Sequence, residues 1–255
     1  FESDDETHYA LDLSGGSETT HTLINITVTN YENGVYIQDV NARIINSILW
    51  NNNSIALGGN SGNNDSTTIY VSNSLVNGGE EGISINDPNN ETSITWLTNN
   101  IDVNPAFVDS ANGDYHLSDL SPAIGAGTAS ITIDNVTYNA PNNDLDGNPR
   151  PNPAGTLPDM GAYESDKGVD PNYAGPVWYV DGPAGLPYGN GGPGAPFTTI
   201  QAGIDASSAG DTVSVKAGTY IENIDYNEKR LVIIGENRET TIIDGSSNDS
   251  SVVVI

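Results

Sequence analysis

The segment DLDGN carries oxygen-bearing side chains at a spacing that suits a hard cation. Asp144, Asp146 and Asn148 stand at alternating positions, and Gly147 between them allows a tight turn. Ca²⁺ takes six to eight oxygen ligands from carboxylates, carbonyls and amides. These three side chains therefore form a predicted calcium-binding loop.

The segment DSANGD offers a second candidate set, made of Asp109, Asn112 and Asp114. Neither loop is a complete EF-hand, because the bidentate glutamate at the twelfth position is missing. The alternative for both loops is an Asx turn, since Asp and Asn side chains bond their own backbone two residues on. Ca²⁺ is the one cofactor that we predict, and both interpretations stay open here.

Other residue types that carry chemistry do not form a catalytic pattern. The chain has no cysteine and no Gly-x-Ser-x-Gly motif, which excludes a thiol nucleophile and a nucleophile elbow. His8, His21 and His116 lack the close spacings that suggest a metal centre. Arg43, in ARIINS, is predicted to be a surface residue. We assign no catalytic residue and predict that the protein is not an enzyme.

The charge balance excludes several classes of partner. Seven Lys and Arg oppose 34 Asp and Glu, which gives a formal net charge of −27. Nucleic-acid binding needs a basic surface, and an anionic membrane would repel this chain. The longest apolar runs, such as Leu231–Ile234, are far too short to span a bilayer. An acidic surface suits solubility outside a cell, so we expect an extracellular or cell-surface protein.

Short runs with period-two alternation dominate the sequence. In HTLINITVTN, Ile24, Ile26 and Val28 alternate with polar residues, which predicts a strand with one buried face. Further runs of the same style recur at roughly ten-residue spacing. They are Gly34–Ile37, Arg43–Trp50, Ser54–Leu57, Thr67–Val76, Gly82–Ile85, Thr212–Val215, Leu231–Ile234, Thr240–Ile243 and Ser251–Ile255.

The pattern favours a solenoid over a sandwich. Asn-Ser and Asn-Gly turns follow the strands at similar points, as in NITVTN, IINSILWNN and YVSNSLVNGG, and stacked coils would let Asn pair with Asn above and below. The only good helical pattern is Thr198–Ser208, with Thr198 or Thr199 as the N-cap. We predict an all-β, right-handed parallel β-helix with one short cap helix near 198–208.

Longer blocks add a family resemblance. The blocks WYVD, FTTIQAGIDASSAGDTVSVKAGTYIENI and LVIIGENRETTIIDG, within Val177–Gly245, resemble the opening of right-handed β-helix proteins of the pectin-lyase-like superfamily. Residues 46–165 resemble the closing half of a related surface group, the choice-of-anchor Q type. The blocks that match there are NIDVNPAFVDSANGDYHLSDLSPAIGAGT and NNDLDGNPRPNPAGTLPDMGAYE. In that group these blocks close the fold.

The closing half precedes the opening half, so the order is permuted. We predict residues 1–165 as the C-terminal half of one β-helix domain, 166–175 as a linker, and 176–255 as the cap and first coils of the next. Joining Ile255 to Phe1 would restore one complete domain. The order therefore favours a unit of a tandem array, or separate copies that stack end to end, and a third interpretation is an engineered permutant or an arbitrary fragment.

These features lead to three functional hypotheses. The first is an extracellular structural repeat of a filament or surface array, whose partners are copies of itself joined from the Ile255 edge to the Phe1 edge. The second is an adhesin or a carbohydrate-binding surface module, with glycans as partners. The third is a polysaccharide lyase or another carbohydrate-active enzyme, which rests on fold analogy alone.

Overall fold

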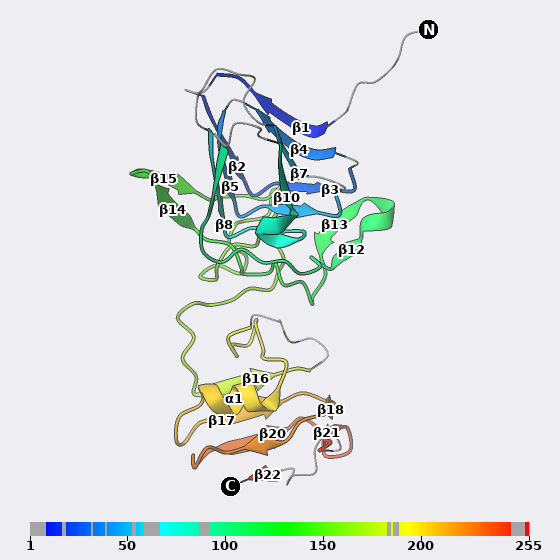
Figure 1. Cartoon of the computed structure of the whole chain (residues 1–255). Coiled ribbons are helices and arrows are strands. Elements are labelled where there is room, and N and C mark those ends of the chain that lie inside the picture. The colour runs from blue at the N-terminus through cyan, green and yellow to red at the C-terminus, as the bar shows by residue number, and fades with distance from the viewer. Residues whose placement is uncertain are drawn as a thin grey trace.

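The chain folds into a mostly β structure whose parallel sheets stack as a β-solenoid of about eight turns (Figure 1). This computed structural model describes residues 9–16, 19–31, 33–38, 40–52, 55–58, 67–86, 92–182, 185, 189–245 and 253–254. The predicted all-β, parallel solenoid is confirmed. In the described residues the only helix of seven or more residues is α1, Ile200–Ala206.

Three parallel sheets form the upper body in Figure 1. The first sheet contains β1 (Tyr9–Ser14), β4 (Asn33–Gln38), β7 (Ile55–Gly58) and β10 (Ile83–Asn86). The second sheet contains β2 (Thr20–Ile24), β5 (Asn41–Ile45), β8 (Thr67–Ser72) and β11 (Thr92–Trp96). The third sheet contains β3 (Thr27–Thr29), β6 (Ile48–Trp50) and β9 (Leu75–Val76). Each coil thus contributes one strand to each sheet in turn.

Period-two alternation fills the interior of this body. Leu23, Ile44, Val71 and Trp96 pair in register across β2, β5, β8 and β11, so one inward position repeats in consecutive coils. Ile44 and Val71 are fully buried, and Leu23 and Trp96 pack against the same core. Each fully buried aliphatic side chain contributes about 1.5–3 kcal/mol relative to its exposed state. Stacked apolar columns therefore supply the main stabilisation.

An asparagine column marks the corner between the second and third sheets. Asn25, Asn46, Asn73 and Asn99 all have positive φ, between 48° and 60°, and each lies just after a strand of the second sheet or its continuation. Asn tolerates the left-handed region better than other non-glycine residues. The Asn46 Nδ2 donates to Asn25 Oδ1 at 3.2 Å, so the predicted stacking of Asn on Asn is confirmed.

A second, exposed asparagine ladder lies at the end of the third sheet. Asn30 and Asn51 also have positive φ, and Asn51 Nδ2 donates to Asn30 Oδ1 at 2.7 Å. Asn77 then accepts from the Asn51 backbone N–H at 3.2 Å. The same turn chemistry therefore recurs at two corners, one covered at Asn25, Asn46 and Asn73 and one open to solvent.

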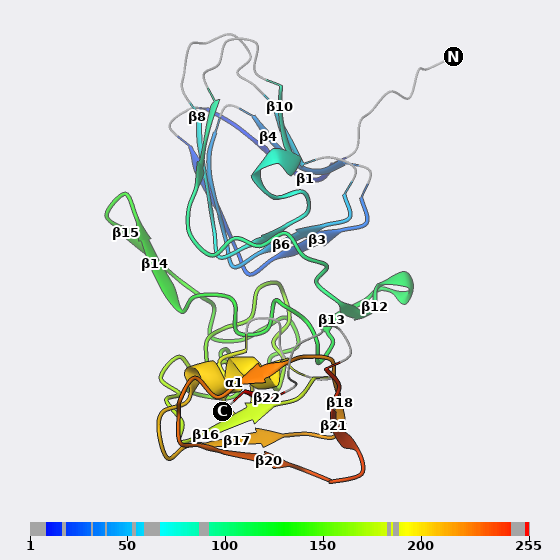
Figure 2. The same cartoon turned by 60° about the horizontal axis from the view of Figure 1, so that its bottom comes forward.

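The closing segment, defined as residues 104–165, packs beside the coils, against the outer face of the third sheet. Its regular elements are β12 (Phe107–Asp109), η2 (Ser110–Asn112), β13 (Asp114–Leu117), β14 (Ser130–Ile133) and β15 (Val136–Asn139), while η1 (Gly79–Gly82) precedes it. Figure 2 shows its two hairpins projecting on opposite sides. Ala123 and Met160 pack on Ile48 and Leu75 of the sheet. The outer face of the third sheet is therefore buried at Ile48 and Leu75.

The lower body repeats the arrangement of strands. The first of its sheets contains β16 (Val177–Val180), β17 (Thr212–Val215) and β20 (Val232–Gly235). In the other two, β18 (Gly218–Tyr220) pairs with β21 (Thr241–Ile243), and β19 (Ile224–Asp225) pairs with β22 (Val253–Val254). Helix α1 buries Ile200 and Ile204 against Val180 and Val213. Thr199 caps the helix by accepting from the Ala202 N–H at 3.2 Å, as predicted.

The segment predicted to be a linker contains a buried residue. Val169 packs with Ile124 of the closing segment and Ala195 of the lower body. The Leu157 N–H donates to the Val169 carbonyl at 2.9 Å. Whether 166–175 separates two domains stays a prediction, but its centre is held by contacts on both sides.

Replacing Asn46 with Ala should destabilise the fold strongly. The change removes three hydrogen bonds, to Asn25 Oδ1 and to the N–H and carbonyl of Thr128, and leaves Ala in the left-handed region. We expect the free energy of unfolding to fall by about 2–4 kcal/mol, measured by urea denaturation. Asn51→Ala is the matched control, because its ladder is exposed, and should lose about 1–2 kcal/mol. Equal losses would contradict a special role for the covered column.

Candidate functional site

The DLDGN loop is closed around the carboxylate of Asp144. Its Oδ1 accepts from the N–H groups of Asp146 (3.0 Å) and Asn148 (2.8 Å). Its Oδ2 accepts from Asn148 Nδ2 at 3.1 Å and from the Glu164 N–H at 2.9 Å. Burial acts to raise the pKa of Asp144, but these hydrogen bonds outweigh it and lower the pKa below its usual value. The loop has the geometry of the Asx-turn alternative.

The DSANGD loop also satisfies its own side chains. Asn112 Nδ2 donates to Asp109 Oδ2 at 2.7 Å, and Asp114 Oδ1 accepts from the His116 N–H at 3.1 Å. Asp109, Asn112, Asp146 and Asn148 are exposed. Among the residues described, no group of three or more His, Cys, Asp or Glu could hold a metal ion. Calcium binding by the six candidate ligands stays a prediction.

His116 joins the two predicted loops. Its Nδ1 lies 2.6 Å from Asp114 Oδ1, its Nε2 lies 2.8 Å from Asp146 Oδ2, and its ring packs on Tyr163 with centroids 4.1 Å apart. Hydrogen bonding to Asp146, and then to Asp114, raises the pKa of His116. The hydrogen bonds that Asp114 accepts from His116 lower the pKa of Asp114. We call Asp114, His116 and Asp146 the histidine clamp.

A buried charge cluster anchors the last block of the closing segment. Arg150 Nε donates to Glu164 Oε2 at 2.6 Å, and both side chains are buried. Asp159, also buried, accepts from the N–H groups of Gly125 (2.7 Å) and Ser165 (2.6 Å). Burial, and then the nearby Glu164 carboxylate, raises the pKa of Asp159 well above its usual value. These groups are fully engaged in holding the fold.

The prediction that Arg43 lies on the surface is wrong. Its guanidinium lies between the rings of Tyr70 and Tyr138, at 5.5 and 5.3 Å, and donates to Asp134 at 3.0 Å. The hairpin of β14 and β15 supplies Tyr138 and Asp134, so Arg43 becomes buried. Because that hairpin follows Arg43 by some ninety residues, no local pattern could have revealed the contact.

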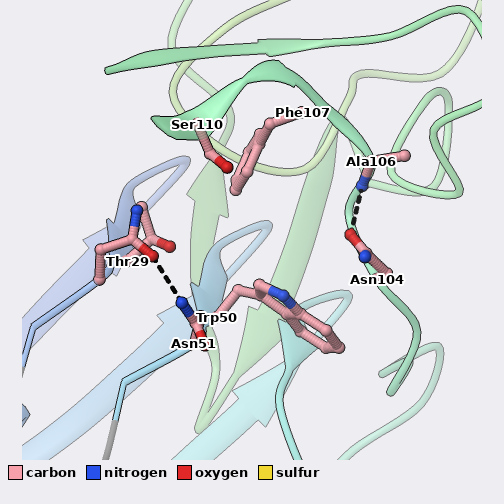
Figure 3. A pocket seen from close by; sticks show the side chains of 8 residues that line it. Thr29, Trp50, Asn51, Asn104, Ala106, Phe107 and Ser110 are labelled. Atoms are coloured by element: carbon pink, nitrogen blue, oxygen red, sulfur yellow. Dashed lines mark hydrogen bonds between the residues drawn. The ribbon is translucent and has the colours of Figure 1, made fainter. Parts of the chain in front are cut away.

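A pocket of about 380 Å³ lies between the closing segment and the third sheet. Figure 3 shows Ser110 and Phe107 at the top, Thr29 at the left, Asn51 and Trp50 below them, and Asn104 and Ala106 at the right. The lining residues are Thr29, Asn30, Trp50, Asn51, Asn104, Ala106, Phe107 and Ser110. None of them carries a charge, although the whole chain is strongly acidic.

The two end coils of the solenoid have open strand edges. Among the described strands, β1, β2 and β3 each pair on one side only, with β4, β5 and β6. The strands β20, β21 and β22 likewise pair only with β17, β18 and β19. A free strand edge presents unpaired N–H and C=O groups that another strand can complete. The strands β10, β11 and β16, where the two bodies face each other along the chain, also pair with a described strand on one side only. The edges at the two ends of the described chain are the candidate interface with a second copy.

The class that this geometry defines is the parallel β-solenoid. Comparison of the chain with protein-family models, with curated proteins and with solved structures finds no match. Among the described helices, none is long and apolar enough to cross a membrane.

The histidine clamp should make stability depend on pH. Because the two carboxylates raise the pKa of His116 above its ordinary 6.5, the clamp stabilises fully below pH 6.5. That contribution is lost as pH rises through the folded-state pKa. The difference in unfolding free energy between wild type and His116→Gln should therefore shrink with rising pH in urea titrations. A difference that grows would contradict the clamp, and Asp146→Asn should flatten the profile.

Asp144→Asn should destabilise the closing segment whether or not calcium is present. The new amide group would face one of the N–H donors that now bond the carboxylate. We expect a loss of about 1–3 kcal/mol by urea denaturation, equal in excess chelator and in added Ca²⁺. Asp109→Asn, which affects one exposed hydrogen bond, is the control and should lose less. A loss that appears only with Ca²⁺ present would instead support the calcium prediction.

Proposed function

We propose that this chain is a structural repeat of an extracellular filament or surface array, built from β-solenoid units joined end to end. The observation that carries the proposal is the pair of open end coils. In each unit the strands β20, β21 and β22 would pair with β1, β2 and β3 of the next. The proposed role is structural, not enzymatic.

The two end coils have the same order of strands. In each, a strand of the first sheet is followed by the second and third strands in the same cyclic order. One coil before the lower end, the turn after the third strand β19 is similar, because Asn227 has φ 51°, close to the 60° of Asn30 and the 52° of Asn51. Equivalent strands and turns would let the sheets continue across a junction without a change of register.

The direction of winding also supports continuation. In Figure 1 the chain passes from β1 through β4 and β7 to β10 down the upper body, and from β16 through β17 to β20 down the lower one. The open edges lie at opposite ends of the molecule, with β1 at the top and β22 at the bottom (Figure 1). A head-to-tail contact of this kind does not close on itself and therefore builds a fibre.

Exposed apolar side chains accompany the lower edge. Val232, Ile234 and Ile242 lie in its strands β20 and β21, and each is about half exposed, between 48% and 52%. Apolar residues of high β propensity on a free edge favour pairing with another strand. The predicted contact between Ile255 and Phe1 themselves lies outside the described residues, so the proposal rests on the neighbouring strands.

The finer family assignment belongs to the same proposal. We propose that the solenoid is right-handed, of the pectin-lyase-like superfamily, and of the choice-of-anchor Q type that its closing blocks resemble. This assignment supports a place on a cell surface or in the extracellular matrix. It is independent of the edge argument, which needs only the strand order.

A change that blocks either edge should stop assembly. Mixing two variants that are blocked at opposite edges should yield one-to-one complexes. The Asn41 N–H bonds the Thr19 carbonyl and the Asn25 N–H bonds the Ile45 carbonyl, so the odd-numbered residues of β2 face β5. The backbone of Thr22 then faces the open edge, and Thr22→Pro removes its donor without breaking the β2–β5 ladder. At the lower edge, the double change Val232→Lys with Ile234→Lys adds two charges.

Sedimentation velocity over a range of concentrations measures the outcome. The sedimentation coefficient of the wild-type chain should rise with concentration, because the chains stack. Each edge variant alone should associate at least about tenfold more weakly. A mixture of the two variants should form a one-to-one complex through the edges left open. The control Leu120→Lys with Val136→Lys adds the same charge at residues 45% and 50% exposed and should assemble like wild type. A wild-type chain that stays monomeric throughout would sink stacking of separate chains.

A covalent array is tested by a two-copy chain in which residue 255 of one copy is followed by residue 1 of the next. If β20–β22 pair with β1–β3 across the junction, the two-copy chain should melt at a higher temperature than the single chain. Placing the Thr22→Pro change in the second copy should abolish that increase. An unchanged melting temperature in both chains would contradict pairing at the junction.

A further inference from the structure

We propose that the pocket between the closing segment and the third sheet binds one neutral pyranose ring. This goes beyond end-to-end assembly, because ligand binding needs no second copy, although the pocket adjoins the upper open edge at Thr29, the last residue of β3. The chemistry that points to a sugar is the combination of two aromatic rings with fixed amide and hydroxyl groups in an uncharged lining. Most of the surface that lines the pocket is polar, which suits a ligand rich in hydroxyl groups.

The absence of charge in the lining favours a neutral ligand over an anionic one. All eight residues are neutral, while the chain as a whole carries a formal net charge of −27. A phosphate or carboxylate ligand is bound most strongly by a cationic side chain, and the lining offers none. A neutral ligand rich in hydroxyl groups avoids that requirement. The volume of about 380 Å³ lies near the lower end of the range for small-molecule sites, which suits a single ring.

The aromatic rings are held in place before any ligand arrives. Trp50 and Phe107 both pack against the buried cluster that contains Ile48. Phe107 also meets Tyr115 edge to face, with centroids 5.4 Å apart, and the Tyr115 hydroxyl accepts from Asn30 Nδ2 at 3.3 Å. A pre-organised wall reduces the entropy that binding must overcome.

Two asparagine amides have their orientation set by one hydrogen bond each. Asn104 Oδ1 accepts from the Ala106 N–H at 2.9 Å, which leaves its Nδ2 as a donor to the pocket. Asn51 Nδ2 donates to Asn30 Oδ1, which leaves Asn51 Oδ1 as an acceptor. In Figure 3 the two side chains lie across the pocket from one another. Sugar hydroxyls donate and accept together, so they can meet both groups.

The pocket wall also keeps a strained residue. Ala106 has φ 50°, a left-handed conformation that costs a non-glycine residue about 1–2 kcal/mol. The hydrogen bond from its N–H to Asn104 holds it there. The strain brings Ala106 and Asn104 to one side of the pocket. Residues held in such conformations cluster at ligand sites.

NMR titration of the whole chain tests the proposal. The probes are methyl α-glucopyranoside, methyl β-galactopyranoside and methyl α-mannopyranoside, each added to a ¹⁵N-labelled sample. At least one should shift the Trp50 indole N–H and the side-chain amides of Asn51 and Asn104, with a dissociation constant of about 1 mM or weaker. The Trp50 signal is assigned from Trp50→Phe. Shifts confined to other residues, or none with any probe at tens of millimolar, would overturn it.

Ser110→Phe fills the pocket and provides the matched test. Ser110 is exposed and lines the pocket, whereas Ser130 is exposed on β14, away from it. Binding should weaken at least about tenfold in Ser110→Phe and remain unchanged in Ser130→Phe, with both chains folded by their spectra. Choline chloride serves as a cationic probe. Binding of choline without any pyranoside would overturn the neutral-ligand assignment, as would equal binding by Ser110→Phe.

Discussion

A covered column of left-handed asparagines ties the coils to the closing segment at the corner between the second and third sheets. Each coil must turn sharply there, and Asn25, Asn46 and Asn73 adopt the required positive φ. Their side chains then bond outward, to Asp159 and Gly161 carbonyls from Asn25 and to Thr128 from Asn46. These asparagines therefore have two roles. They form the turn, and their side chains hydrogen-bond backbone groups of the closing segment that covers the turn.

Covering that corner decides where the closing segment can lie. Gly161, with φ 94°, passes so close to Ile48 and Thr27 that an added Cβ would lie within 2.8 Å of both side chains. The segment thus runs along the third sheet, and the buried pair of Arg150 and Glu164 holds its last block. A buried ion pair that loses one partner is strongly destabilising, so this block tolerates little change. Lateral closure also leaves the edge of the first coil open.

The open edges and the pocket are two consequences of one arrangement. A solenoid whose closing segment lies beside the coils exposes β1–β3 at one end and β20–β22 at the other. The same lateral segment forms a wall against the exposed asparagine ladder of Asn30 and Asn51, and the pocket lies between them. The pocket adjoins the open edge at Thr29 of β3, and an assembled fibre would present one pocket per unit.

Period-two alternation, an N-cap and repeated turns are local signals, and they predicted many strands of the coils, the cap helix and the asparagine stacking. They did not predict the two hairpins of the closing segment. Contacts between residues far apart in the chain become visible only in the folded structure. It placed Arg43 between two tyrosines, joined the two acidic loops through His116, and brought Trp50 and Phe107 to one pocket. Neither spacing nor composition encodes which segment covers a given face. That choice follows from the packing of the closing segment on the third sheet.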